Sequence, residues 1–362
     1  MQKIRIAKFF LHLSIILGIL KLFATNGYAI NILTKIQNIH GKLFIFGFFG
    51  TLITFEKVFN TAFKFIPIFF IAGALTEIVN SVIAIKYMHP CLKLIPSSLY
   101  LCGGFMFSIF SLKNYIYLKM QSYYFNFLAG LLLSISSILS KDMRTLLDFE
   151  NVEYFILFPV FVILGERIEL SRVFGNNIFT SIQPLFATIT FVLYTITIFV
   201  PGIYKIEKLC LLLLILISFA NDIKIQMTKL VKIPPIQRYF RTTLNISYIF
   251  AITGILLLIY RRFEPGFHSL SLGFIFGMVF SHSIIIFPSI FGKMPKEEKL
   301  SYLPFTIFTL GNIVRIVSST IIYGGILPQK IIPFFSIINI ASGFIHFISL
   351  ILLFVMIKSM TR

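Results

Sequence analysis

The chain has 362 residues, of which 57% are hydrophobic and only 12% are charged, and its mean hydropathy is +0.93. An ordinary soluble domain carries about 25% charged residues, so a soluble fold could not hide this much apolar surface. The net charge is +19, but the Lys and Arg residues fall singly or in pairs between apolar runs, a pattern of membrane topology that argues against nucleic-acid binding. We therefore predict an all-α polytopic transmembrane helix bundle in which residues 1–362 form one integral membrane domain, with the lipid bilayer as its partner.

The N-terminus combines three basic residues, Lys3, Arg5 and Lys8, with an apolar run from Phe9 to Ala24. This is the layout of a signal peptide. No clear small-x-small cleavage site follows, so we expect the run to be retained as the first span.

Apolar windows with few internal charges predict about twelve membrane spans. We place them at 9–25, 40–57, 65–85, 95–112, 120–139, 152–170, 180–200, 206–221, 242–260, 267–289, 301–325 and 332–357. The longest polar connection, 222–241, is about twenty residues long, which leaves no room for a soluble catalytic domain.

Orientation follows from the basic residues. With the N-terminus inside, the termini and cytoplasmic loops hold 19 of them and the other side holds 12, with Arg315 inside a span. This bias favours two cytoplasmic termini and a place in the cell membrane.

The second span begins at His40, and Gly47 follows seven residues later, about 20° from the same helical face. A flat macrocycle could then lie against bare backbone below a histidine ligand. The alternative is that Gly47 and Gly50 serve close helix packing.

Two charges fall in the middle of spans, Glu77 in the third and Arg315 in the eleventh. A lone charge in hydrocarbon costs several kcal/mol, and the two lie at similar depth, so we predict that they pair or line a common cavity. Three readings stay open: a structural ion pair, a proton relay through Glu77, or an arginine that holds a haem propionate or an anionic substrate. A further cluster, Glu166-Arg167-Ile168-Glu169, sits at the end of the sixth span, where charged heads reach water easily, which favours a structural role.

The tenth span carries His268 and His282, fourteen residues apart. At 100° per residue the two imidazoles of an α-helix are 40° short of four full turns and about 21 Å apart, on one face. Such a helix could serve two stacked haems; the alternative is two unrelated polar residues. Gly273 and Gly277 form a GxxxG pattern on the other face, which indicates helix contact.

The predicted depths of the histidines in the membrane indicate which of them could form pairs. His40 and His268 both begin spans at the outer edge, while His346 lies fourteen residues into the twelfth span and His282 fifteen residues into the tenth. We therefore predict an outer pair, His40 with His268, and an inner pair, His282 with His346. His12 is a spare candidate for the inner site.

Three blocks of the chain resemble sequences of a known group of membrane proteins. They are His40-Gly41-x-Leu43 continuing into Gly47-Phe48-x-Gly50-Thr51-Leu52-Ile53 and Glu56-Lys57, Gly165-Glu166-Arg167-x-Glu169-Leu170-Ser171-Arg172, and His268-Ser269-Leu270-x-Leu272-Gly273-Phe274 leading to Met278, His282 and Phe287-Pro288. They look like blocks of uncharacterised prokaryotic twelve-span proteins, which are similar to NnrS-type haem proteins of the nitric-oxide response and, more distantly, to the catalytic subunit of haem–copper oxidases.

The resemblance implies a twelve-helix bundle that holds haem b, with a role in nitric-oxide response or membrane electron transfer and hence a small gaseous ligand or an electron donor as partner. The chain departs from the pattern at Thr309, where a histidine is expected six residues before Arg315. The bunched histidines of an oxidase helix are also missing, which argues against copper.

Three classes of function compete, and the third is a structural or assembly factor or a lipid-processing enzyme, for which the chain shows no acidic or nucleophilic signature. The first is a haem-binding membrane protein with His40, His268, His282 and His346 as metal ligands and Arg315 beside the cofactor. The alternative is a secondary transporter that uses Glu77 and Arg315, although the halves show no convincing repeat. No catalytic triad, P-loop or dinucleotide fingerprint is present, so the sequence assigns no enzyme activity.

Overall fold

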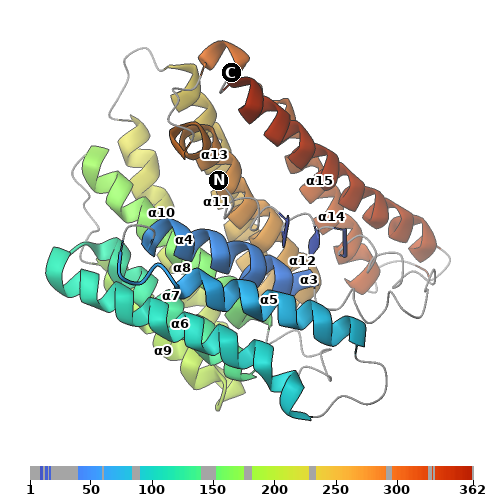
Figure 1. Ribbon diagram of the computed structural model, residues 1–362. Helices are drawn as coiled ribbons and strands as arrows, with labels where there is room; N and C mark the ends of the chain where they lie inside the picture. The colour runs from blue at the N-terminus through green and yellow to red at the C-terminus, as the bar shows by residue number, and fades with distance from the viewer. Residues whose placement is uncertain are drawn as a thin grey trace. The chain divides into compact units, whose positions relative to one another are not determined.

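The computed structural model describes residues 9–10, 13–14, 16–17, 40–58, 61–83, 90–139, 152–174, 182–227, 234–290, 296–324, 328 and 331–360. Over these residues the regular elements are helices throughout, with no strand, as Figure 1 shows. The all-α prediction is confirmed.

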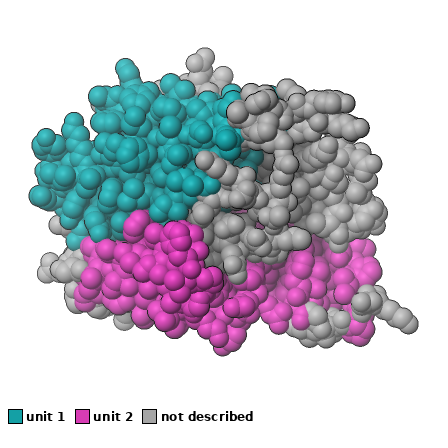
Figure 2. Space-filling model, turned by 90° about the horizontal axis from the view of Figure 1, so that it is seen from below, with its two compact units in different colours: residues 1–165 teal, residues 166–362 magenta. Residues whose placement is uncertain are grey.

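The chain divides into two compact units, 1–165 and 166–362 (Figure 2). The expectation of one membrane domain over 1–362 stays a prediction.

Unit 1 is built from helices that follow one another along the chain. They are α3 (His40–Lys42), η2 (Leu43–Gly50), α4 (Thr51–Val58), α5 (Ile66–Ile83), α6 (Pro90–Leu118), α7 (Gln121–Leu139) and the first part of α8 (Val152–Phe174). Small residues bring α6 and α7 together: a Cβ added at Gly130 would lie 2.8 Å from the carbonyl oxygen of Gly104. Only glycine permits so close an approach, which is the way in which membrane helices pack.

Unit 2 holds the rest of α8 and the C-terminal helices. They are α9 (Ile182–Thr197), η5 (Pro201–Ile203), α10 (Tyr204–Met227), α11 (Pro235–Ile259), α12 (Phe263–His268), η6 (Ser269–Phe276), α13 (Gly277–Ile290), η7 (Glu297–Lys299), α14 (Leu303–Gly324) and α15 (Ile332–Met360). α12, η6 and α13 are continuous and form the predicted tenth span. Its glycines pack on α11, since a Cβ at Gly273 would meet Phe250 and one at Gly277 would meet Ser247. The predicted helix contact of these two glycines is confirmed, although His282, which was predicted on the opposite face, packs on α11 as well.

Five described helices are long and apolar enough to cross a membrane: 94–118, 235–259, 263–284, 303–324 and 332–360. They correspond to the predicted spans four, nine, ten, eleven and twelve, and they identify a membrane protein.

Several helices continue past the predicted apolar windows. α10 runs from Tyr204 to Met227 and so includes Asp222 and Lys224, which the sequence placed at the edge of a polar connection. A hydropathy window ends where charges begin, but a helix continues wherever its backbone bonds and side-chain partners are satisfied.

Candidate functional site

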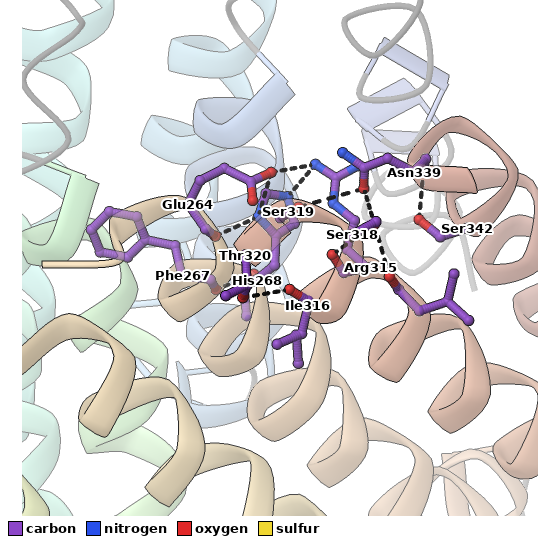
Figure 3. A network of polar contacts seen from close by, with 12 residues as sticks. Glu264, Phe267, His268, Arg315, Ile316, Ser318, Ser319, Thr320, Asn339 and Ser342 are labelled. Carbon is purple, nitrogen blue, oxygen red and sulfur yellow. Dashed lines mark hydrogen bonds and ion pairs between the residues drawn. The ribbon is translucent and has the colours of Figure 1, made fainter. Parts of the chain in front are cut away.

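Three ionisable side chains meet inside the spans of unit 2: Glu264 and His268 from α12, and Arg315 from α14 (Figure 3). We call them the Glu–His–Arg cluster. Arg315 Nη2 donates to Glu264 Oε1 over 2.7 Å and lies 3.1 Å from His268 Nε2. Glu264 and His268 share a helical face because they are four residues apart. Arg315 lies near the middle of its span, 303–324, where a charged group is costly and generally functional. Glu264 and His268 lie near the start of theirs, 263–284.

The partners of His268 fix its tautomer. Nδ1 lies 2.8 Å from the carbonyl oxygen of Glu264, which can only accept, so Nδ1 carries the proton. Nε2 then presents its lone pair to the Arg315 guanidinium, which can only donate. The imidazole is therefore neutral, and a metal ion at Nε2 would have to displace Arg315.

A ladder of polar contacts joins α14 to α15 next to this cluster. Ser318 Oγ lies 3.1 Å from Asn339 Oδ1, and His346 Nε2 lies 2.8 Å from Asn312 Oδ1. His346 is 5% exposed, and its ring fits against Gly311, where a Cβ would lie 3.2 Å from Nε2. His346 is thus a satisfied helix-contact residue in this arrangement.

His282 differs from the other histidines of unit 2. Its Nδ1 lies 2.7 Å from the carbonyl oxygen of Met278, and its Nε2 is buried without a hydrogen-bond partner among the described residues. The ring lies edge-on to Phe240 of α11, with 5.2 Å between centroids. A neutral imidazole with Nδ1–H on a backbone carbonyl and a free lone pair on Nε2 has the orientation of a metal-ligating histidine.

The prediction that His268 and His282 share one face is wrong. Between them lies η6, a π-helix, whose i→i+5 bonds place more residues in each turn and lag the α-helix by roughly 150° over eight residues. His268 consequently faces Arg315 of α14, whereas His282 faces Phe240 of α11. Segments of π-helix frequently occur at functional sites.

The predicted inner pair also separates, since His346 contacts Asn312 of α14 while His282 packs on α11. The outer pair, His40 with His268, would join the two units and stays a prediction. His12 lies outside the described residues.

Unit 1 has its own ion pair close to a π-helix. His40 opens α3, η2 follows it, and Lys42 Nζ donates to Glu77 Oε1 over 2.7 Å. Glu77 and Arg315 thus each have an ion-pair partner within their own unit, and a pair between them stays a prediction.

The side chains around Gly47 distinguish its two proposed roles, haem contact and helix packing. A Cβ at Gly47 would lie 3.0 Å from Phe10 and 3.2 Å from Ala74. These side chains occupy the space that a macrocycle would need, so Gly47 serves helix packing. Gly50 does the same, because a Cβ there would lie 2.6 Å from Phe70.

The sequence does not predict a role for Glu264, because the apolar window of the tenth span begins only at residue 267. Its position four residues before His268 was the signal that could have found it. The sequence also does not predict the partners of Arg167, which is 7% exposed. Arg167 Nη2 and Nε donate to the two carboxylate oxygens of Asp222 over 2.6 and 3.0 Å, and the Tyr248 hydroxyl donates to the same carboxylate over 2.8 Å.

Within the described part of the chain, no group of three or more His, Cys, Asp or Glu side chains is placed to hold a metal ion.

A family model described as Domain of unknown function (DUF8744) matches residues 5–327. No curated protein and no solved structure matches the chain.

Proposed function

We propose a function for this chain, which belongs to the DUF8744 family: it binds b-type haem in the cell membrane, in nitric-oxide response or membrane electron transfer. In this proposal about twelve spans cross the bilayer and both termini are cytoplasmic. His282 holds the iron, and His268, with Arg315 beside it, is the candidate ligand for a second haem on the α14 side of the same span.

The observation that supports the proposal best is that His282 Nε2 is buried and has no hydrogen-bond partner in the part of the chain that the structure describes. A buried polar atom without a partner costs about 1–3 kcal/mol, and coordination to iron removes this cost. The bond from Nδ1 to the Met278 carbonyl holds the ring in the tautomer that ligation requires. When bound, haem supplies an iron that takes a small gas or an electron.

His268 fits a haem less directly, because its Nε2 faces the Arg315 guanidinium. A role as ligand would require that guanidinium to turn away, and it would then be free to hold a propionate. We assign His346 no ligand role, since its Nε2 already contacts Asn312.

The test is the visible spectrum of protein purified after expression with ample haem. Parent protein should show a Soret band and a reduced-minus-oxidised difference spectrum, and His282→Ala should lose most of the Soret absorbance while staying in the membrane. His346→Ala is the matched control and should keep its haem. A colourless parent protein, or a His282→Ala variant as coloured as the parent, would contradict the proposal.

A second candidate function is secondary transport, which the Glu–His–Arg cluster favours. Protonation of His268 at Nε2 would end its acceptance from Arg315, so proton uptake would break one contact between α12 and α14. Proton-coupled transporters use titratable groups within their spans as proton relays.

This alternative predicts proton movement that depends on Glu264. In liposomes loaded with a pH-sensitive dye, parent protein should dissipate an imposed pH gradient and Glu264→Gln should not. Glu56→Gln, at a half-exposed carboxyl on α4, should behave like the parent. Equal rates for parent protein and for empty liposomes would rule the transport reading out.

A further inference from the structure

The turn between α11 and α12 contains an unusual choice of residue. The Arg261 N–H donates to the Leu258 carbonyl and the Arg262 N–H to the Leu257 carbonyl, each over 2.8 Å, which is the bonding of a Schellman motif with Arg261 at the left-handed position. Arg261 has φ 57°. Glycine normally occupies this position because it has no Cβ to clash, so arginine is placed here against the local backbone preference.

The surroundings of Arg261 concentrate positive charge at one end of unit 2. Its guanidinium carbon lies 6.0 Å from the centroid of the Tyr204 ring, and the Tyr204 hydroxyl donates to the Leu258 carbonyl over 2.7 Å. The segments 198–205 and 260–263 are thereby side by side. Together they contain three basic residues, Lys205, Arg261 and Arg262. The carboxylates that follow them, Glu207 and Glu264, are paired with other cations, Lys208 and Arg315. We call these three residues the basic turn.

The basic turn lies at the level of a membrane surface. Arg261 and Arg262 lie between α11 and α12, which belong to apolar stretches long enough to span a bilayer, 235–259 and 263–284, and Lys205 lies at the start of α10. Two aromatic side chains close by are strongly exposed, Phe199 by 80% and Tyr260 by 76%. Exposed aromatic rings at span ends are typical of the lipid headgroup region.

We propose that the basic turn binds the phosphate of an anionic lipid headgroup. Guanidinium groups donate in a planar fork that matches phosphate oxygens, and clustered Lys and Arg at span ends attract acidic lipids. A favourable contact with the C-terminal dipole of α11 would account for a basic residue here, but it would not require that residue at the left-handed position, where glycine is the unstrained choice. The proposal is independent of haem binding.

The experiment compares the parent protein with Arg261→Gly, because glycine suits the left-handed backbone and should leave the fold as stable as before or more so. Thermal unfolding is followed in detergent while phosphatidylglycerol or phosphatidylcholine is added. Only phosphatidylglycerol should raise the Tm of the parent protein. Arg261→Gly should need a roughly fivefold higher phosphatidylglycerol concentration for the same rise.

The matched control is Lys119→Gly. Lys119 also has a left-handed backbone, φ 54°, at the end of a helix, α6, and its neighbour Tyr117 is 75% exposed. It has the same left-handed backbone, and residues 114–118 and 120–124 contain no further Lys or Arg, so its substitution should leave the phosphatidylglycerol response unchanged. Arg262→Ala leaves the left-handed residue 261 unchanged, and it should weaken the phosphatidylglycerol response as Arg261→Gly does.

Three results would overturn the proposal. The first is an unchanged phosphatidylglycerol response in both Arg261→Gly and Arg262→Ala. The second is an equal Tm rise with phosphatidylcholine. The third is an equal rise with inorganic phosphate at matched concentration, after which phosphatidylglycerol adds nothing, because the ligand would then be a soluble phosphate and not a lipid.

Discussion

At the scale of single residues, buried charge in this protein is matched locally. Each buried charge described above has its counter-ion on a neighbouring helix: Lys42 with Glu77, Arg167 with Asp222, and Arg315 with Glu264. Attraction between such charges offsets their desolvation only where geometry is good and the remaining polar atoms are bonded. Arg167 and Asp222 meet this condition most fully, because their contact is bidentate and the Tyr248 hydroxyl adds a third bond.

This pair gives a prediction about stability. Asp222→Asn should lower the free energy of unfolding by about 3–5 kcal/mol, because it leaves the Arg167 guanidinium buried without a counter-ion. Glu56→Gln removes a half-exposed partner of Lys57 and should cost less than about 1 kcal/mol. Chemical unfolding of both variants in detergent micelles provides the measurement. Equal losses would show that burial does not set the cost.

At the scale of elements, hydropathy predicts most of the helices, since an apolar run of sufficient length has no other structure in a bilayer. It does not predict how a helix winds. The residues Ser269–Phe276 are apolar on most sides, so no periodicity reveals that they form a π-helix. The helical face predicted for His282 was therefore wrong, although the predicted span was right.

The candidate site was predictable to a similar extent. His268 and Arg315 could be selected because ionisable groups in spans are rare, and both belong to the Glu–His–Arg cluster. The polar contacts between α14 and α15 depend on Asn312 and Asn339, which carry no charge and give no signal in a search for ionisable residues. Their roles depend on which helix faces which, and this is a property of packing.

At the scale of the whole molecule, composition alone identifies a membrane protein, and five described helices of spanning length agree with it. The number of spans decides on which side each end lies, because every further span carries the chain to the opposite side. If the number of spans is even and the excess of Lys and Arg lies on the cytoplasmic side, both ends of the chain are cytoplasmic.

The predicted topology can therefore be tested with reporters fused at different positions of the chain. Fusions at the N-terminus and the C-terminus should both give a cytoplasmic signal, from a reporter that is active only there. Two internal fusions calibrate the count, because a reporter placed after residue 120 follows four predicted spans and should be cytoplasmic, while one after residue 140 follows five and should be outside. Opposite signals from the two ends would mean an odd number of spans. Because α6 and α7 are joined by the short turn at 119–120, identical signals at positions 120 and 140 would show instead that this hairpin does not cross the bilayer twice.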